Sequence, residues 1–207
     1  MDSSLKNFEI LHLRNEKFVK PFTLRFEIDG QARFWDCVKV HDSVSILIFN
    51  EESKNFVLVR QFRPSVWYYE NTHENSDKSG YTYELCAGIM DKNLSAKQTA
   101  IEEIFEETGY KVNDLEFITT CYSALGFGAN RQDFFYAAVK NSDKIAQGGG
   151  VDGEKIEIIN LPLNKAENFA FDDNFIKAPG LVMCFLWFFK KHKNFKKPSK
   201  IIIIVKY

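Results

Sequence analysis

The sequence predicts an α/β fold, in which helices flank a mixed β-sheet as an α/β/α sandwich behind a small N-terminal antiparallel β meander. Two observations carry this prediction. Short apolar strand patterns recur along the chain, and an amphipathic helix pattern at residues 96–108 separates the earlier strands from the later ones. Strands interspersed with a few helices are typical of a sheet with helices on its outer faces.

Composition limits the class of protein. The 207 residues allow one large domain or one domain with a small appendage, and 45% of them are apolar, so a sizeable core can form. The net charge of −1 gives no reason to expect a nucleic-acid partner. The N-terminus lacks an apolar signal segment, the apolar run at 181–189 is too short for a membrane span, and the spacing of the four cysteines favours free thiols. We therefore expect a cytoplasmic protein without a membrane partner.

Residues 1–41 form the first expected unit, a meander for dimerisation and base binding. Residues 22–28 alternate between apolar and polar side chains, Asp29-Gly30 is a hairpin turn signal, and residues 31–40 follow as the returning strand. Such a small sheet has no core of its own. We therefore expect it to pack against the rest of the chain or against a second subunit in a homodimer.

Residues 42–196 form the main domain, and residues 197–207 form a C-terminal tail without an assigned role. The central helix is expected to start after Ser95 as N-cap and to end at Gly109. Residues 66–82 are expected to be a loop. The remaining elements are strands at 43–50, 56–63, 83–87, 115–123, 133–139 and 155–161, and helices at 163–171 and 177–190.

Four carboxylates crowd the end of the central helix, at Glu102, Glu103, Glu106 and Glu107. Residues three and four apart share one face of a helix, and like charges at that spacing repel. Such a cluster persists where water screens it or where a cation neutralises it. Its hard oxygen ligands suit Mg²⁺ or Mn²⁺, whereas the alternative is an ordinary solvated acidic face.

The segment from Gly88 to Tyr110 resembles the Nudix box, because the glutamates and both glycines keep the spacing of that box together. Two positions depart from it. Leu94 stands where the family usually has its first Glu, and Glu102 stands where the family usually has an Arg that pairs with the box carboxylates and orients them. The resemblance implies a Nudix-type fold and metal-dependent hydrolysis.

The resemblance extends over about residues 20–190 and is closest to the UDP-sugar pyrophosphatase branch, a relative of the ADP-ribose pyrophosphatases. It implies hydrolysis of a nucleoside diphosphate sugar, foremost UDP-glucose to UMP and glucose 1-phosphate, with ADP-ribose as the alternative substrate. Because Glu102 replaces the usual Arg, a catalytically weakened Nudix fold that binds a nucleotide or a protein stays open. The segments that carry the resemblance are 35–44, 57–64, 83–88, 148–150 and 154–163.

The resemblance also implies a metal site for Mg²⁺, with Mn²⁺ possible. The expected ligands are Glu103 and Glu107, then Glu106 directly or through water, and the backbone carbonyl of Ala87. More than one ion is often used to neutralise a diphosphate and to deliver hydroxide.

The catalytic base is expected in the loop after the three glycines. Glu154 is the candidate base and Asp152 its helper, because a carboxylate on a loop can close over the substrate. The alternative is that both are ordinary loop charges.

Five further residues are expected to bind the substrate. Arg63 presents a guanidinium fork for the diphosphate, with Glu84 as its partner or part of the metal shell; a surface salt bridge is the alternative. Trp35 would stack on the nucleobase, unless it fills the core. Gly126 and Gly128 allow the backbone of their loop to approach the sugar.

Overall fold

The structure is a computed structural model, and two of the expectations fall outside the residues it describes. These two are Asp152 and the tail 197–207. The described residues are 9–11, 13, 18–73, 79–151 and 153–193.

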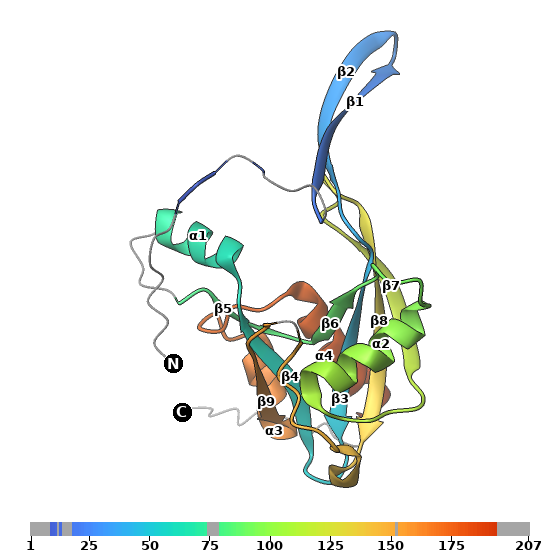
Figure 1. Cartoon of the computed structure of the whole chain (residues 1–207), viewed down its shortest axis with the longest axis vertical. Helices are drawn as coiled ribbons and strands as arrows, with labels where there is room; N and C mark the ends of the chain where they lie inside the picture. Colours follow the sequence, from blue (N-terminus) through green and yellow to red (C-terminus); the bar gives the residue numbers. More distant parts are fainter. Residues whose placement is uncertain (1–8, 12, 14–17, 74–78, 152, 194–207) are drawn as a thin grey trace, which may run out of the picture.

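The N-terminal region forms one antiparallel hairpin in its described part. β1 (Lys20–Ile28) pairs with β2 (Gln31–Lys39) over its whole length, from Ile28 opposite Gln31 to Lys20 opposite Lys39. The turn residues Asp29 and Gly30 both have positive φ, 52° and 73°, as a two-residue hairpin loop requires. The predicted turn is therefore confirmed. The hairpin projects away from the rest of the molecule (Figure 1).

A mixed sheet forms the centre of the main body, as predicted. It has seven strands, because two strands, Tyr81–Glu84 and Cys86–Ile89, stand where one was expected at 83–87. Its main path runs β5-β4-β3-β8-β7, with β6 paired to β3 and β9 to β4. The pairing of β3 with β8 is parallel and the other pairings are antiparallel. The strands are β3 (Ser43–Asn50), β4 (Asn55–Phe62), β5 (Tyr81–Glu84), β6 (Cys86–Ile89), β7 (Glu116–Ser123), β8 (Asn130–Val139) and β9 (Ile156–Pro162).

Helices cover both faces of this sheet, which confirms the three-layer sandwich. One face carries α2 (Ala96–Glu103), which continues as the π-helical turn η1 (Ile104–Thr108). The other carries α3 (Leu163–Ala170) and α4 (Pro179–Lys191). The short 3₁₀ turn η2 (Asn141–Asp143) follows β8.

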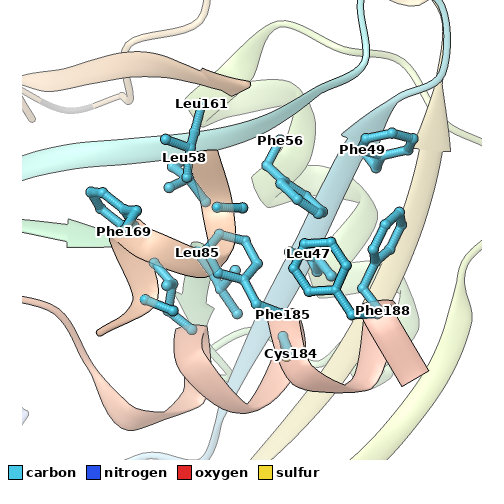
Figure 2. Packing of buried hydrophobic residues seen from close by; sticks show 14 of the residues in the cluster. Leu47, Phe49, Phe56, Leu58, Leu85, Leu161, Phe169, Cys184, Phe185 and Phe188 are labelled. Atoms are coloured by element: carbon cyan, nitrogen blue, oxygen red, sulfur yellow. The ribbon is translucent and has the colours of Figure 1, made fainter. Parts of the chain in front are cut away.

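Alternation along the central strand β3 divides the core in two. Leu47 and Phe49 pack toward α4, whereas Ile46 and Ile48 pack toward α2. Figure 2 shows the α4 side, where the rings of Phe49 and Phe188 lie 4.8 Å apart between their centroids. Truncation of such a buried Phe to Ala typically costs about 3–5 kcal/mol of stability.

The expectation of a loop over 66–82 is wrong in its first half. Residues Pro64–His73 form the helix α1. Pro64 follows the strand expected at 56–63, and proline is also favoured in the first turn of a helix. The side chains of α1 show no helical apolar period, so hydrophobic patterning could not reveal it.

The helix α4 illustrates how the apolar run near the C-terminus is used. The helix has 13 residues, and Leu181, Cys184 and Phe185 on it are buried against the sheet. Among the described residues, no helix combines the length and the apolar character that a membrane crossing needs.

Candidate active site

Local sequence signals position the helix that carries the glutamates. Ser95 caps α2 with a complete capping box, since its side chain accepts from the Gln98 backbone N–H and the Gln98 side chain accepts from the Ser95 backbone N–H. Gly109 ends the element in the left-handed region, with φ of 74°. Both predictions are confirmed. The π-helical turn that carries Glu106 and Glu107 was not predicted; such turns are frequent at functional sites.

Glu103 and Glu107 line a cavity of about 400 Å³. The cavity collects side chains from the central helix, from the strands β3 to β6 and β8, and from the loop that precedes β9. Six of its lining residues were expected at the site from the sequence: Arg63, Glu84, Ala87, Glu103, Glu107 and Glu154.

Gly88 makes room for one of the two glutamates. A Cβ atom built on Gly88 would lie 2.0 Å from Oε1 of Glu103 and 2.1 Å from its Cδ. Any side chain at position 88 would therefore push Glu103 out of its place beside β6. The glycine that opens the box is thus required by a close approach rather than by its φ angle.

Glu107 is the most enclosed carboxylate of the cluster. It is 4% exposed, and its Oε2 accepts a hydrogen bond of 3.1 Å from the backbone N–H of Ala87. Burial raises its pKa to about 8, although the hydrogen bonds from Cys86 and Ala87 oppose the shift. An unneutralised carboxylate is therefore unfavourable at this position.

The pKa of the Glu103 carboxyl is raised for a related reason. Burial, followed by repulsion from Glu106 and Glu154, raises its pKa to about 7. A divalent cation in the cavity would remove this repulsion and favour the charged forms. The acidic helix is therefore more than a solvated face, because its cavity-facing carboxylates are partly or fully buried.

The three glycines after β8 dock the loop of Glu154 on the end of the helix. The backbone N–H of Gly149 donates to the carbonyl of Glu107 at 2.8 Å, and that of Gly150 donates to the carbonyl of Glu106 at 3.1 Å. A Cβ atom on Gly150 would lie 2.8 Å from Oε2 of Glu154. The glycine loop thereby brings Glu154 to the cavity.

Arg63 and Glu84 form a two-bond ion pair in the cavity wall. Nε and Nη2 of Arg63 donate to the two carboxylate oxygens of Glu84 at 2.7 and 2.6 Å. This hydrogen-bonded pairing raises the pKa of Arg63. Burial alone would raise the pKa of Glu84, but the bonds from Arg63 and Thr82 hold it below its usual value. Glu84 is thus the partner of Arg63.

The other three residues expected to bind the substrate, Trp35, Gly126 and Gly128, do not line this cavity. Trp35 is on the hairpin, 54% exposed, and its Nε1–H donates to the carbonyl of Gly126 at 2.7 Å. The alternative that Trp35 fills the core is therefore wrong. Gly126 and Gly128 belong to the β7–β8 loop, which also accepts a 2.7 Å bond from Val38 through the carbonyl of Phe127. The loop supports the base of the hairpin.

Four polar residues of the cavity were not expected from the sequence. Ser43 and Ser45 come from β3, Gln61 from β4 and Gln132 from β8, and Nε2 of Gln132 donates to Oγ of Ser45 at 3.0 Å. Ser45 is 5% exposed although it lies in an apolar strand. A polar residue within an apolar strand is the signal that could have pointed to Ser45. Its role becomes clear only from the pairing of β3 with β8, which brings Gln132 to it.

The donor set of the cavity fits a hard divalent cation. Glu103, Glu107 and Glu154 contribute carboxylate oxygens, and Ala87 brings backbone to the same wall. Within the described ranges, no group of three acidic, histidine or cysteine side chains is yet gathered closely enough to enclose an ion. A bound cation would therefore draw these carboxylates toward one another.

Comparison with known proteins agrees with this geometry. Residues 39–179 match the model of the NUDIX domain. The uridine diphosphate glucose pyrophosphatase NUDT14 of Mus musculus is 37% identical over 198 residues, covering 84% of this chain and 89% of the relative. A GDP-mannose pyrophosphatase of Citrobacter koseri is 35% identical over 125 residues, covering 60% and 62%.

A solved structure shares the fold. The crystal structure of an ADP compounds hydrolase superposes with a TM-score of 0.67, covering 88% of this chain and 90% of the other at 16% identity. The domain match spans more than half of the sequence, and the mouse relative aligns over most of it. The chain belongs to the Nudix family.

Proposed function

We propose that this chain is a divalent-metal-dependent hydrolase of the pyrophosphate bond in nucleoside diphosphate sugars. Its foremost substrate is UDP-glucose, cleaved to UMP and glucose 1-phosphate. The observation that carries the proposal is the convergence of Glu103, Glu107, Glu154 and Arg63 on one cavity. The names of the mouse and Citrobacter koseri relatives support the substrate class.

Glu103 and Glu107 would hold the metal, with Glu106 and the carbonyl of Ala87 completing the ligands. Mg²⁺ is the proposed ion and Mn²⁺ a substitute, because both prefer hard oxygen donors. When bound, the ion neutralises charge on the diphosphate and lowers the pKa of an attacking water.

Arg63 binds the other side of the diphosphate. Glu84 occupies Nε and Nη2 of the guanidinium and fixes its plane. In the part of the chain that the structure describes, no protein group is bonded to Nη1, which leaves it to donate to a phosphate oxygen.

Glu154 acts as the general base, with Asp152 beside it in sequence. It accepts a proton from the water as the water oxygen bonds to phosphorus and the bridging P–O bond breaks. The bridging oxygen leaves with the second phosphate group. A carboxylate on a loop is suited to this role because the loop can close over the substrate.

The hairpin is proposed to form a homodimer and to contribute Trp35 to base binding. Large apolar side chains on one face of it are 45–54% exposed, namely Phe22, Leu24, Ile28 and Trp35. Contiguous apolar surface of this kind is typical of an interface, and a second copy would cover it. In this scheme residues 1–41 serve dimerisation and base binding, and residues 42–196 form the catalytic domain. The proposed location is the cytoplasm.

The test is hydrolysis of a panel of nucleotide sugars. Purified protein would be incubated with UDP-glucose, ADP-ribose and GDP-mannose, with Mg²⁺, with Mn²⁺ and with a chelator. The proposal expects UMP and glucose 1-phosphate from UDP-glucose, and no product with chelator. Binding of a nucleotide sugar without release of any nucleoside monophosphate would refute it and would identify a binding module instead.

A further inference from the structure

The acidic helix carries Glu102 at the position where the Nudix box usually has an Arg. Glu102 adds a charge beside Glu103 and Glu106. The structure places Lys92 at this point, from the segment between β6 and α2. Nζ of Lys92 lies 2.9 Å from Oε2 of Glu102 and 3.9 Å from Oε1 of Glu106. One ammonium group therefore bridges two carboxylates that are four residues apart.

The four glutamates divide into two pairs along the helix. Glu103 and Glu107 line the cavity. Glu102 and Glu106 do not line it, and their side chains are 42% and 28% exposed. The bridge by Lys92 thus acts on the outer pair, of which Glu106 is also an expected metal ligand.

The segment that presents Lys92 is itself held at both ends. The backbone N–H of Met90 donates to the carbonyl of Asp42 at 2.8 Å, and the capping box at Ser95 fixes the start of the helix. The backbone N–H of Leu94 donates to the carbonyl of Lys92 at 2.8 Å, which tightens the turn between them. The lysine therefore extends from an ordered backbone.

We propose that Lys92 is a positioning residue of the metal site. It holds Glu102 at the rim, away from the ions, and it restrains Glu106 so that its carboxylate stays beside Glu103. This proposal rests on the proposed function, since it assumes that Glu103, Glu106 and Glu107 bind a divalent cation. An Arg at position 102 would reach Glu106 along the helix; here the cation comes from the preceding turn instead.

Two effects of Lys92 on metal binding have opposite signs. An ammonium group that is merely nearby repels Mg²⁺, so its removal would strengthen metal binding. A group that positions the carboxylates favours metal binding, so its removal weakens it. The sign of the change therefore separates positioning from simple proximity.

The experiment is a calorimetric titration of the full chain with Mg²⁺, without substrate, at about pH 8.5 so that the carboxylates are largely ionised. Lys92→Ala is expected to weaken Mg²⁺ binding about fivefold, the upper range for an exposed pair. Lys92→Arg should stay close to the unmodified protein. Lys92→Ala combined with Glu102→Arg should restore binding, because the arginine pairs with Glu106 from within the helix.

Lys97→Ala is the matched control. Lys97 also lies at the surface of this region, with 48% of its side chain exposed against 53% for Lys92, and it pairs with Asp114. Its removal should leave Mg²⁺ binding unchanged. Thermal denaturation of each variant verifies the fold.

Unchanged or tighter Mg²⁺ binding by Lys92→Ala would overturn the proposal, as would an equal loss in Lys97→Ala. A protein that binds no Mg²⁺ would overturn it as well. A protein that binds Mg²⁺ but hydrolyses no nucleotide sugar would refute the proposed function alone, and the affinities of the variants would still decide the role of Lys92.

Discussion

The cavity and the hairpin are built in opposite ways. The cavity gathers side chains from distant segments, such as Arg63, Glu107 and Glu154, and its helix carboxylates Glu103 and Glu107 are partly or fully buried. The hairpin joins two strands that are adjacent in sequence and exposes Phe34 and Trp35 by 66% and 54%. The cavity therefore has its chemical groups within one chain, whereas the hairpin has apolar surface that a second molecule can cover.

This difference predicts separate consequences for catalysis and for association. Changes in the cavity should lower kcat and leave the molecular mass in solution unchanged. Changes on the hairpin should alter KM or the mass and leave the chemical step intact. A cavity variant with a changed molecular mass, or a hairpin variant with a lower kcat, would show that the two regions act together.

Glu107→Gln should have the largest effect. Glutamine keeps the size of the side chain and an acceptor for the Ala87 N–H, but it removes the charge that would bind metal. We expect kcat for UDP-glucose to fall by about 10³-fold or more, with the fold retained. Release of UMP and thermal denaturation measure the two properties.

Glu116→Gln is the control for this variant, because Glu116 lies on β7 and pairs with Lys191. Its kcat should match that of the unmodified protein. Residual activity of Glu107→Gln within tenfold of that protein would remove Glu107 from the metal site.

Glu154→Gln should have the next largest effect. Loss of a general base typically costs about 10²- to 10⁴-fold, so kcat should drop while KM changes little. Steady-state kinetics with UDP-glucose give both parameters. Glu157→Gln is the control, since Glu157 lies on β9 and pairs with Arg60 at 2.8 Å. A loss of similar size in both variants would argue against Glu154 as the base.

Trp35→Ala tests the hairpin side. If Trp35 stacks on the nucleobase, KM for UDP-glucose should rise about tenfold with little change in kcat, because a base–aromatic stack contributes about 1–3 kcal/mol. Phe117→Ala is the control, because Phe117 is also 54% exposed but lies on β7. An unchanged KM in Trp35→Ala would separate the hairpin from substrate binding.

Leu24→Asp tests association on the same hairpin. Leu24 is 48% exposed, and a charge there would oppose its burial by a second copy. We expect a dimer for the unmodified protein and a shift toward the monomer for the variant, measured by light scattering. A monomeric mass for the unmodified protein would contradict the proposed homodimer.

The pH dependence of stability tests the cavity without using activity as the readout. The folded-state pKa values of Glu103 and Glu107 are raised to about 7 and about 8, so the folded protein binds more protons than the unfolded chain above the ordinary carboxyl pKa. Metal-free protein should therefore lose stability as the pH rises from about 4.5 to about 8. Thermal denaturation at a series of pH values measures this loss.

Glu107→Gln should flatten that pH dependence, because of the two carboxylates it removes the one whose pKa is raised further. Mg²⁺ should restore stability at the high-pH end of the window in the unmodified protein. A melting temperature that is flat or rises across this window in the metal-free protein would contradict the burial of these carboxylates.

Local signals in the sequence were enough for much of this protein. The turn at Asp29-Gly30, the cap at Ser95, the end at Gly109 and the spacing of Glu103 and Glu107 each depend on neighbours within a few residues. Such signals can be read without knowing how the chain folds. The helix α1 could not be predicted in this way, because its apolar side chains do not recur with a helical period.

Only the tertiary structure decided which distant groups meet. Ser45 pairs with Gln132 because β3 and β8 are neighbours, and Arg63, which follows β4, pairs with Glu84 on the neighbouring strand β5. Lys92 reaches Glu102 because the turn after β6 folds back on the helix. The sequence by itself determined the carboxylate helix and the hairpin. Which groups pair with the charged side chains depends on contacts between separate segments of the chain, and no local sequence pattern encodes these contacts.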